Sequence, residues 1–219
     1  SQGPVVERFV LDYRRKEYLC ATERWDEAHE LAIRTLALAD RSGSPSIQIW
    51  HGTWALFILC EICDALGNLD QLASHAEDMA ERSVKGDDLV RTRASAWIWR
   101  AVTQRVTGNE RDASRSFHQG LQYLKNLDSR SEVCANPIAR YYELGGDLKA
   151  AVGVRDRELE AITKKGMLHR VCRVQIERCR LLSLAGDVTS ADLDEARRSA
   201  ARLRVPDKYL EKLASIKAQ

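Results

Sequence analysis

Several features that would restrict the function of this chain are scarce. Its 219 residues include only four prolines, and 34 basic and 32 acidic side chains leave a formal net charge of +2. So small a net charge excludes a uniform field that would draw the chain onto nucleic acid or anionic lipid. The longest apolar run covers residues 54–60, far short of the roughly 20 residues that a membrane-spanning helix needs. We therefore expect an ordered chain without a membrane span.

Recognisable catalytic motifs are missing as well. The five histidines are scattered along the chain, and none has a serine, cysteine or carboxylate at the spacing of a catalytic triad. No phosphate-binding loop is present either. We therefore expect a protein that is not an enzyme. Six cysteines in a chain of this length, without a basic and apolar leader, favour free thiols and a cytoplasmic location.

A repeating unit is the strongest positive signal. Five turns begin at residues spaced by 44, 41, 38 and 40 positions, namely Glu23, Gly67, Gly108, Gly146 and Gly186. A period near forty is typical of an α-helical array in which each helix pair buries its apolar face against its neighbours. The sequence therefore predicts an all-α protein, a right-handed α-solenoid of about five antiparallel helix pairs with a C-terminal capping helix.

The periodicity also predicts where the helices lie. A last helix is expected to start near Pro206, after ten helices at about Val5–Arg24, Asp26–Arg41, Ser46–Leu66, Asp70–Val84, Asp88–Thr107, Arg111–Asn126, Ser131–Leu144, Lys149–Lys164, Leu168–Ala185 and Ala191–Leu203. Asn136-Pro137 should either start or kink its helix, and Ser190 is a candidate N-cap in a longer fifth turn. We expect one continuous domain over residues 1–219, cut from a longer protein.

The units resemble tetratricopeptide repeats in their longer form, similar to the sensor region of the bacterial maltose-regulon activator. The family has a small residue seven positions before the turn, and here that register holds Cys60, Ala101, Ala139 and Cys179. The family has a second small residue, located five positions after the start of the turn. Here this residue is Ala28, Ala113 or Ala151. Trp97 and Phe117 match the aromatic positions of the family. The resemblance implies a superhelix in which the first helix of every pair lines a concave groove.

The cysteines have two interpretations. Cys60 and Cys63 have the spacing of half a zinc site or a redox pair, and His169, Cys172 and Cys179 could supply further ligands. Cys60 and Cys179, however, stand in the register position that alanine takes in neighbouring repeats, so a small buried side chain explains them without a metal. We expect neither a metal nor another cofactor.

Transferring the register of the family assigns a candidate groove. It places nine residues there. Seven are the candidate binding residues, Trp54, Phe57, Glu61, Arg105, Arg140, Arg173 and Arg180, and the other two are Asp64 and Glu143. The N-terminal end of the groove would be aromatic and acidic, and the C-terminal end rich in arginine. Arg140, Arg173 and Arg180 could then bind an anionic group. Packing between helices for the aromatic residues, and a solvated helix face for each arginine, remain the alternatives.

These observations favour a non-catalytic scaffold. We expect its groove to bind a protein segment, as part of a bacterial signalling or regulatory protein. The first alternative is a small-molecule sensor domain of a transcriptional regulator, with a small anionic ligand. RNA binding is the least favoured, because RNA-reading repeats need near-identical spacing. The basic run near the C-terminus is more simply a solvated helix face, and it comprises Arg197, Arg198, Arg202, Arg204 and Lys208.

Overall fold

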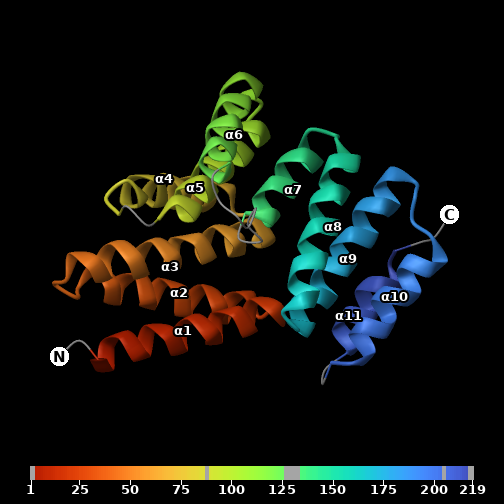
Figure 1. The fold of residues 1–219 in the computed structure, drawn as a ribbon, viewed down its shortest axis with the longest axis horizontal. Helices are drawn as coiled ribbons and strands as arrows, with labels where there is room; N and C mark the ends of the chain where they lie inside the picture. The colour runs from red at the N-terminus through yellow and green to blue at the C-terminus, as the bar shows by residue number, and fades with distance from the viewer. Residues whose placement is uncertain (1–2, 87–88, 126–133, 204–205, 217–219) are drawn as a thin grey trace. The chain divides into compact units, whose positions relative to one another are not determined.

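The described part of the chain is entirely helical. The computed structural model describes residues 3–86, 89–125, 134–203 and 206–216, and these form eleven α-helices and no strand (Figure 1). The prediction of an all-α protein is confirmed. The helices are α1 (Gly3–Ala21), α2 (Trp25–Asp40), α3 (Pro45–Leu66), α4 (Leu69–Ser83), α5 (Val90–Val106), α6 (Glu110–Leu124), α7 (Ala135–Leu144), α8 (Leu148–Lys164), α9 (Leu168–Ala185), α10 (Ser190–Ala201) and α11 (Asp207–Ala214).

Helix ends agree with the sequence prediction to within about three residues wherever both are described. The predicted ends at Asp88, Asn126 and Ser131 lie outside the described residues. α7 starts at Ala135, so the proline that follows Asn136 stands in the first turn, where its missing N–H costs nothing. The predicted cap at Ser190 is wrong.

Thr189 is the actual N-cap of α10. Its hydroxyl accepts a hydrogen bond from the Asp192 backbone N–H, and the Asp192 carboxylate accepts one from the Thr189 backbone N–H. This reciprocal capping box satisfies two backbone donors at once. Ser190 has no carboxylate or amide three residues later that could return the bond, which is why the cap lies one residue earlier.

The five turns share one backbone geometry. Each has a residue with positive φ at its start, between +70° and +80° at Gly67, Gly108, Gly146 and Gly186, and +54° at Glu23. In every turn the next residue donates its N–H to the carbonyl five positions earlier, as Asn68 does to Cys63 at 2.8 Å and Arg24 does to Leu19 at 2.9 Å. This is the Schellman ending of a helix. The sequence repeat is therefore also a structural repeat of the turn.

Glu23 is strained in this turn, and we expect Glu23→Gly to stabilise the protein. A left-handed conformation costs a non-glycine residue roughly 1–2 kcal/mol, and the greater freedom of glycine in the unfolded chain offsets part of this. A net gain of about 0.5–1 kcal/mol should appear in urea unfolding.

The matched change is Gly67→Ala. No atom lies within 4 Å of a Cβ at this position, so only backbone strain is added and a loss of about 1 kcal/mol is expected. Equal stability of the two variants and the unchanged protein would show that the positive φ at these turns carries no energetic cost.

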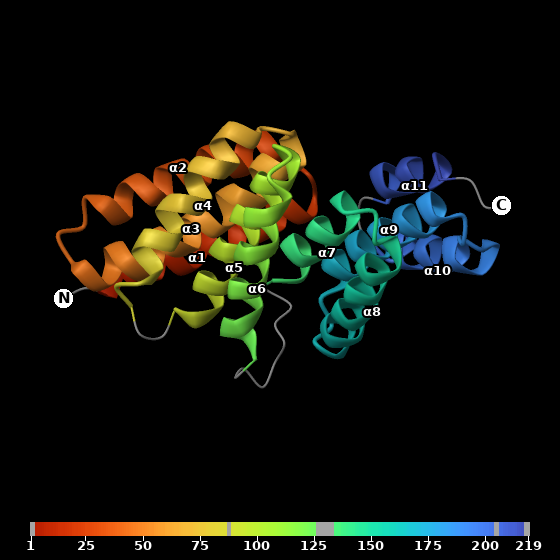
Figure 2. The same cartoon turned by 90° about the horizontal axis from the view of Figure 1, so that it is seen from above.

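The chain divides into two compact units, Ser1–Pro137 and Ile138–Gln219. In the first unit α1, α2 and α3 pack side by side (Figures 1 and 2), and α3 also packs against α4 and α5. α3 is the one described helix that is long and apolar enough to cross a membrane by length and composition, with 56% of its apolar window buried inside the fold. Eleven of its 22 residues are buried, as in a core helix. The expectation of a single continuous domain stays a prediction.

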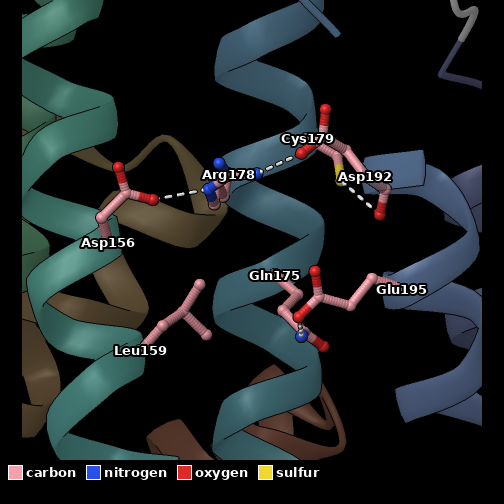
Figure 3. A pocket seen from close by; sticks show the side chains of 7 residues that line it. All are labelled: Asp156, Leu159, Gln175, Arg178, Cys179, Asp192 and Glu195. Atoms are coloured by element: carbon pink, nitrogen blue, oxygen red, sulfur yellow. Dashed lines mark hydrogen bonds and ion pairs between the residues drawn. The ribbon is translucent and has the colours of Figure 1, made fainter. Parts of the chain in front are cut away.

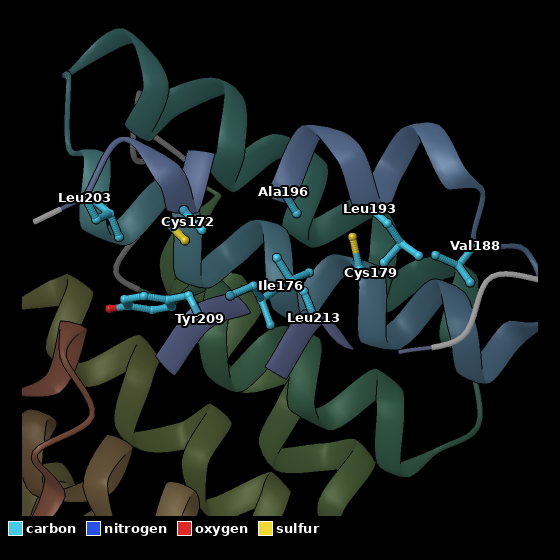
Figure 4. Packing of buried hydrophobic residues seen from close by; sticks show 10 residues of the cluster. Cys172, Ile176, Cys179, Val188, Leu193, Ala196, Leu203, Tyr209 and Leu213 are labelled. Atoms are coloured by element: carbon cyan, nitrogen blue, oxygen red, sulfur yellow. The ribbon is translucent and has the colours of Figure 1, made fainter. Parts of the chain in front are cut away.

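The second unit has its own apolar core. α9 supplies Cys172, Ile176 and Cys179 to a cluster that α10 and α11 complete (Figure 4). Tyr209 and Leu213 of α11 are 3% and 0% exposed, so the last helix closes this core instead of standing apart from it. Val188 also belongs to the cluster, which holds the longer fifth turn against the core.

The small-residue positions of the repeat are buried in every repeat that has them. Cys60, Ala101, Ala139 and Cys179 are at most 2% exposed, and Ala28, Ala113 and Ala151 are fully buried. Small side chains are needed where helices approach closely, because extra methylenes in a packed core force neighbours to shift. The structure thus supports the packing role of Cys60 and Cys179.

We expect the six cysteines to react slowly in the folded protein. All six are free and buried. Burial raises the pKa of the Cys63 and Cys179 thiols to about 11, so at pH 8 only about one in a thousand is the reactive thiolate. An aromatic disulfide reagent should therefore label the native protein slowly and all six thiols at once in guanidinium. Several fast thiols in the native state would contradict this prediction.

Candidate functional site

An aromatic cluster joins α1 and α3 in the first unit. Trp54 packs edge-to-face on Tyr13, with ring centroids 5.9 Å apart, and on Phe57, with centroids 5.6 Å apart. Trp54 and Phe57 lie three residues apart and therefore on neighbouring positions of one helix face. Phe57 is buried and Trp54 is half-buried. The structure thus brings together two of the predicted groove residues and adds Tyr13, which the sequence did not single out.

Basic groups lie next to this aromatic cluster. His51 stacks on Phe9, with ring centroids 4.1 Å apart, and Lys16 of α1 is only 2% exposed. Burial lowers the pKa of Lys16 to about 8, against the opposing effect of Asp12. Burial and the nearby Lys16 charge also lower the pKa of His51. His51 is therefore mostly neutral at pH 7, whereas Lys16 is mostly charged.

The charged groove candidates of the first unit, Glu61 and Arg105, are less accessible to a ligand. Glu61 is half-buried and lies one helical turn after Phe57 on α3. Arg105 of α5 donates from Nε and Nη2 to one carboxylate oxygen of Glu110, at 3.0 and 2.9 Å. Its side chain is 15% exposed. Arg105 therefore braces the turn between α5 and α6.

In the second unit two predicted arginines are joined through one carboxylate. Arg180 donates to both oxygens of Glu143, at 2.8 and 3.0 Å, and to Glu177 at 2.9 Å. Arg140 contacts Glu143 at 3.2 Å. Burial by itself would raise the pKa of Glu143, but Arg180 and then Arg140 hold that pKa below its usual value. An anionic ligand would have to displace these carboxylates.

Arg173 differs from Arg140 and Arg180 in its ion pairing. It lies seven residues before Arg180 on α9, about two helical turns away, and is half-buried. No carboxylate among the described residues forms an ion pair with it. The C-terminal end of the candidate groove is therefore less positive than predicted. Arg140 and Arg180 are balanced by Glu143 and Glu177, and Arg173 is the predicted arginine that forms no ion pair with a described residue.

A cavity of about 210 Å³ lies between α8, α9 and α10 in the second unit (Figure 3). Arg178 spans it, with contacts of 2.6 Å to Asp156 and 2.7 Å to Asp192. Gln175 donates to Glu195 at 3.1 Å, while its own Oε1 is buried and has no hydrogen-bond partner among the described residues. The lining therefore has an excess of negative charge and a free acceptor. Its full set is Asp156, Leu159, Gln175, Arg178, Cys179, Asp192 and Glu195.

No sequence pattern predicts this cavity. Its charged residues come from three helices, and Asp156, Arg178 and Asp192 are at least 14 positions apart in sequence, so no compact motif relates them. The cavity is smaller than the roughly 300 Å³ at which pockets for drug-sized ligands begin. It is large enough for water or a small hydrogen-bond donor.

Comparison with known proteins supports the fold. No protein-family model matches the chain, and no curated protein matches its sequence. Among solved structures it is similar to the crystal structure of BtubC (BKLC) from P. vanneervenii, a helical protein. The two are 19% identical, the match covers 91% of this chain and 81% of that chain, and the TM-score is 0.51. At this identity the similarity is evidence for the helical fold alone.

Proposed function

We propose that this protein is a non-catalytic scaffold of tetratricopeptide-like repeats that binds a protein segment. In this proposal the helix pairs form a right-handed solenoid, and their first helices line its concave groove. The identical geometry of the five turns and the buried small-residue positions support the repeat. A cytoplasmic regulatory or signalling protein is the setting that fits such a module and its free thiols.

The observation that carries this proposal is the aromatic surface of α1 and α3. Trp50 stands one turn before Trp54 on the same helix and is 45% exposed. Tyr13 of α1 is half-buried and packs on the ring of Trp54. Tryptophan and tyrosine dominate the binding energy of protein interfaces because they bury much area at little cost in entropy. An extended or helical segment with apolar anchors would fit this surface.

The test uses a peptide selected from a random display library against the purified chain. Trp50→Ala should weaken binding of that peptide by about tenfold or more, as measured by fluorescence polarisation. Val84→Ala is the matched control, because Val84 is 68% exposed and follows α4, the second helix of its pair. Peptides that bind both variants equally would place the binding surface elsewhere, and failure to select any peptide would count against the proposal.

The cavity of the second unit favours the alternative, a small-molecule sensor of a transcriptional regulator. Its three carboxylates, single guanidinium and free Gln175 oxygen suit a small cationic donor better than an anion. Ammonium or methylammonium should then raise the melting temperature more than sodium at equal ionic strength, and Glu195→Gln should remove the difference. No difference between the cations would exclude this site as a sensor.

A further inference from the structure

Three metal-ligating side chains meet in the first unit. They are His29 of α2, Cys63 of α3 and His75 of α4, and one ligand atom of each lies within 4.8 Å of the others. These three helices are consecutive, and α3 packs against both of the others. Cys63 is fully buried and the two histidines are half-buried. The cluster thus has a buried sulfur at its base and two imidazoles toward the surface.

The ligand set suits a borderline-soft divalent ion. Imidazole nitrogen and thiolate sulfur are the donors that zinc takes most often, at about 2.0–2.1 and 2.3 Å. A tetrahedral ion with such bonds holds its ligand atoms about 3.3–3.7 Å apart. The separations, which are at most 4.8 Å, therefore need to close by at most about 1.5 Å. Half-buried histidine side chains can make this adjustment by rotation.

Metal binding fixes the protonation states of the three ligands. A metal takes each histidine as the neutral imidazole and the cysteine as the thiolate. Binding of a zinc ion therefore replaces the proton of the Cys63 thiol by a zinc–sulfur bond and releases that proton to solvent.

Gln71 provides outer support. In the described structure the Cys63 thiol contacts Gln71 Oε1 at 3.9 Å. Rotation of the amide would turn its NH₂ group toward a thiolate, and such outer hydrogen bonds orient metal ligands and tune their basicity. Three protein ligands leave a fourth coordination position that water can occupy.

We propose that His29, Cys63 and His75 form a zinc site with three protein ligands and one open position. The site joins the second helix of one pair to both helices of the next pair. A bound ion therefore fixes the packing of two successive pairs. The Cys60-Cys63 pair is not the site, because Cys60 lies among the small-residue packing positions of the core.

The experiment uses the reduced, purified protein with cobalt as a spectroscopic probe. One cobalt ion should bind and give a thiolate-to-cobalt charge-transfer band, and zinc should displace it. Cys63→Ser should abolish the band, and His75→Gln should weaken zinc binding at least about 100-fold in competition with a chromophoric chelator.

Two control variants separate a site from general damage. Cys60→Ala places the residue of the neighbouring repeats in an equally buried position, and His118→Gln changes an exposed histidine of α6. Both should bind cobalt and zinc as the unchanged protein does. Circular dichroism before metal addition shows whether each variant is folded. If Cys63→Ser is unfolded, His75→Gln, at a half-buried position, tests the site in its place. A charge-transfer band that persists in folded Cys63→Ser, or no such band in the unchanged protein, overturns the proposal.

Discussion

Replacement of Glu158 by alanine should lower the free energy of unfolding by about 3–5 kcal/mol, the largest loss that we expect from a single substitution here. Glu158 is 3% exposed and lies between Arg155 and Arg170, with contacts of 2.8 and 2.9 Å. Removal of its carboxylate breaks both contacts and takes away the carboxylate that lies 2.8 Å from the buried guanidinium of Arg155. The cost is that of breaking a buried ion pair, well above that of one lost hydrogen bond.

Glu160→Ala is the control for this experiment. Glu160 lies two residues later on α8 and pairs with Lys164, but both side chains are about 70% exposed. Exposed pairs contribute little to stability, because solvent screens them. Urea unfolding of the two variants should therefore differ several-fold in the stability lost. A similar small loss in both would mean that solvent reaches Glu158 in the folded protein.

The pH dependence gives an independent reading of the same group. Burial by itself would raise the pKa of Glu158, but Arg155 and then Arg170 outweigh it and hold that pKa below its usual value of 4.5. A carboxyl with a lower pKa in the folded state contributes stability that is complete at neutral pH and is lost as the pH falls through the folded pKa. The difference between the unchanged protein and Glu158→Ala should thus shrink below pH 4.5. Parallel loss of stability in the two proteins would contradict this.

Gly120→Ala is expected to cost about 1–3 kcal/mol, as overpacked cores do. Gly120 lies on α6 where it packs against α5, and an added Cβ would lie 2.5 Å from Ile98 Cγ1 and 3.0 Å from the Ala94 carbonyl oxygen. Ile98 is fully buried, and a backbone oxygen cannot rotate away. The two helices must therefore separate to admit one methyl group.

The same exchange at Gly153 should have the opposite sign. Gly153 lies inside α8, and a Cβ there would meet only the end of the Arg157 side chain, at 3.8 Å. Alanine is preferred to glycine in a helix interior by about 0.8–1 kcal/mol. Thermal unfolding should show a higher midpoint for Gly153→Ala and a lower one for Gly120→Ala. Equal shifts would mean that helix propensity alone governs both positions.

The helices and turns could be predicted because they depend on neighbours in sequence. Gly67-Asn68 and Gly108-Asn109 carry both the left-handed residue and the next N-cap, since each asparagine side chain accepts a bond from the backbone N–H three residues later. The cap at Thr189 was missed for a local reason too. Its partner Asp192 was present in the sequence, but the neighbouring Ser190 has a hydroxyl with the same capping ability.

The residue types of the candidate groove could be predicted from the sequence, but the net charge of its C-terminal end could not. The bond from Arg180 to Glu143 crosses between helices 37 positions apart in sequence, so it depends on how α7 and α9 pack. The pairs of Arg140 with Glu143 and of Arg180 with Glu177 are three residues apart and could have been read from the sequence. These two pairs reduce the net positive charge of the C-terminal end of the candidate groove.

The histidine and cysteine cluster was beyond sequence reasoning. His29 lies 34 residues before Cys63, and His75 lies 12 residues after it, a pattern that matches no compact metal motif. Only the packing of three successive helices brings these side chains together. The cavity lined by Asp156 and Arg178 has the same origin.

The shared geometry of the turns also bears on how the chain acquires its fold. In each turn the closing bond spans only five residues, from Arg24 to Leu19 at one end and from Asp187 to Leu182 at the other. Structures dominated by such short-range contacts fold fast, because little chain entropy is lost before a contact forms. A hairpin of this kind can close while later residues are still being added at the ribosome. Each newly made pair then finds the preceding one already in place as a template.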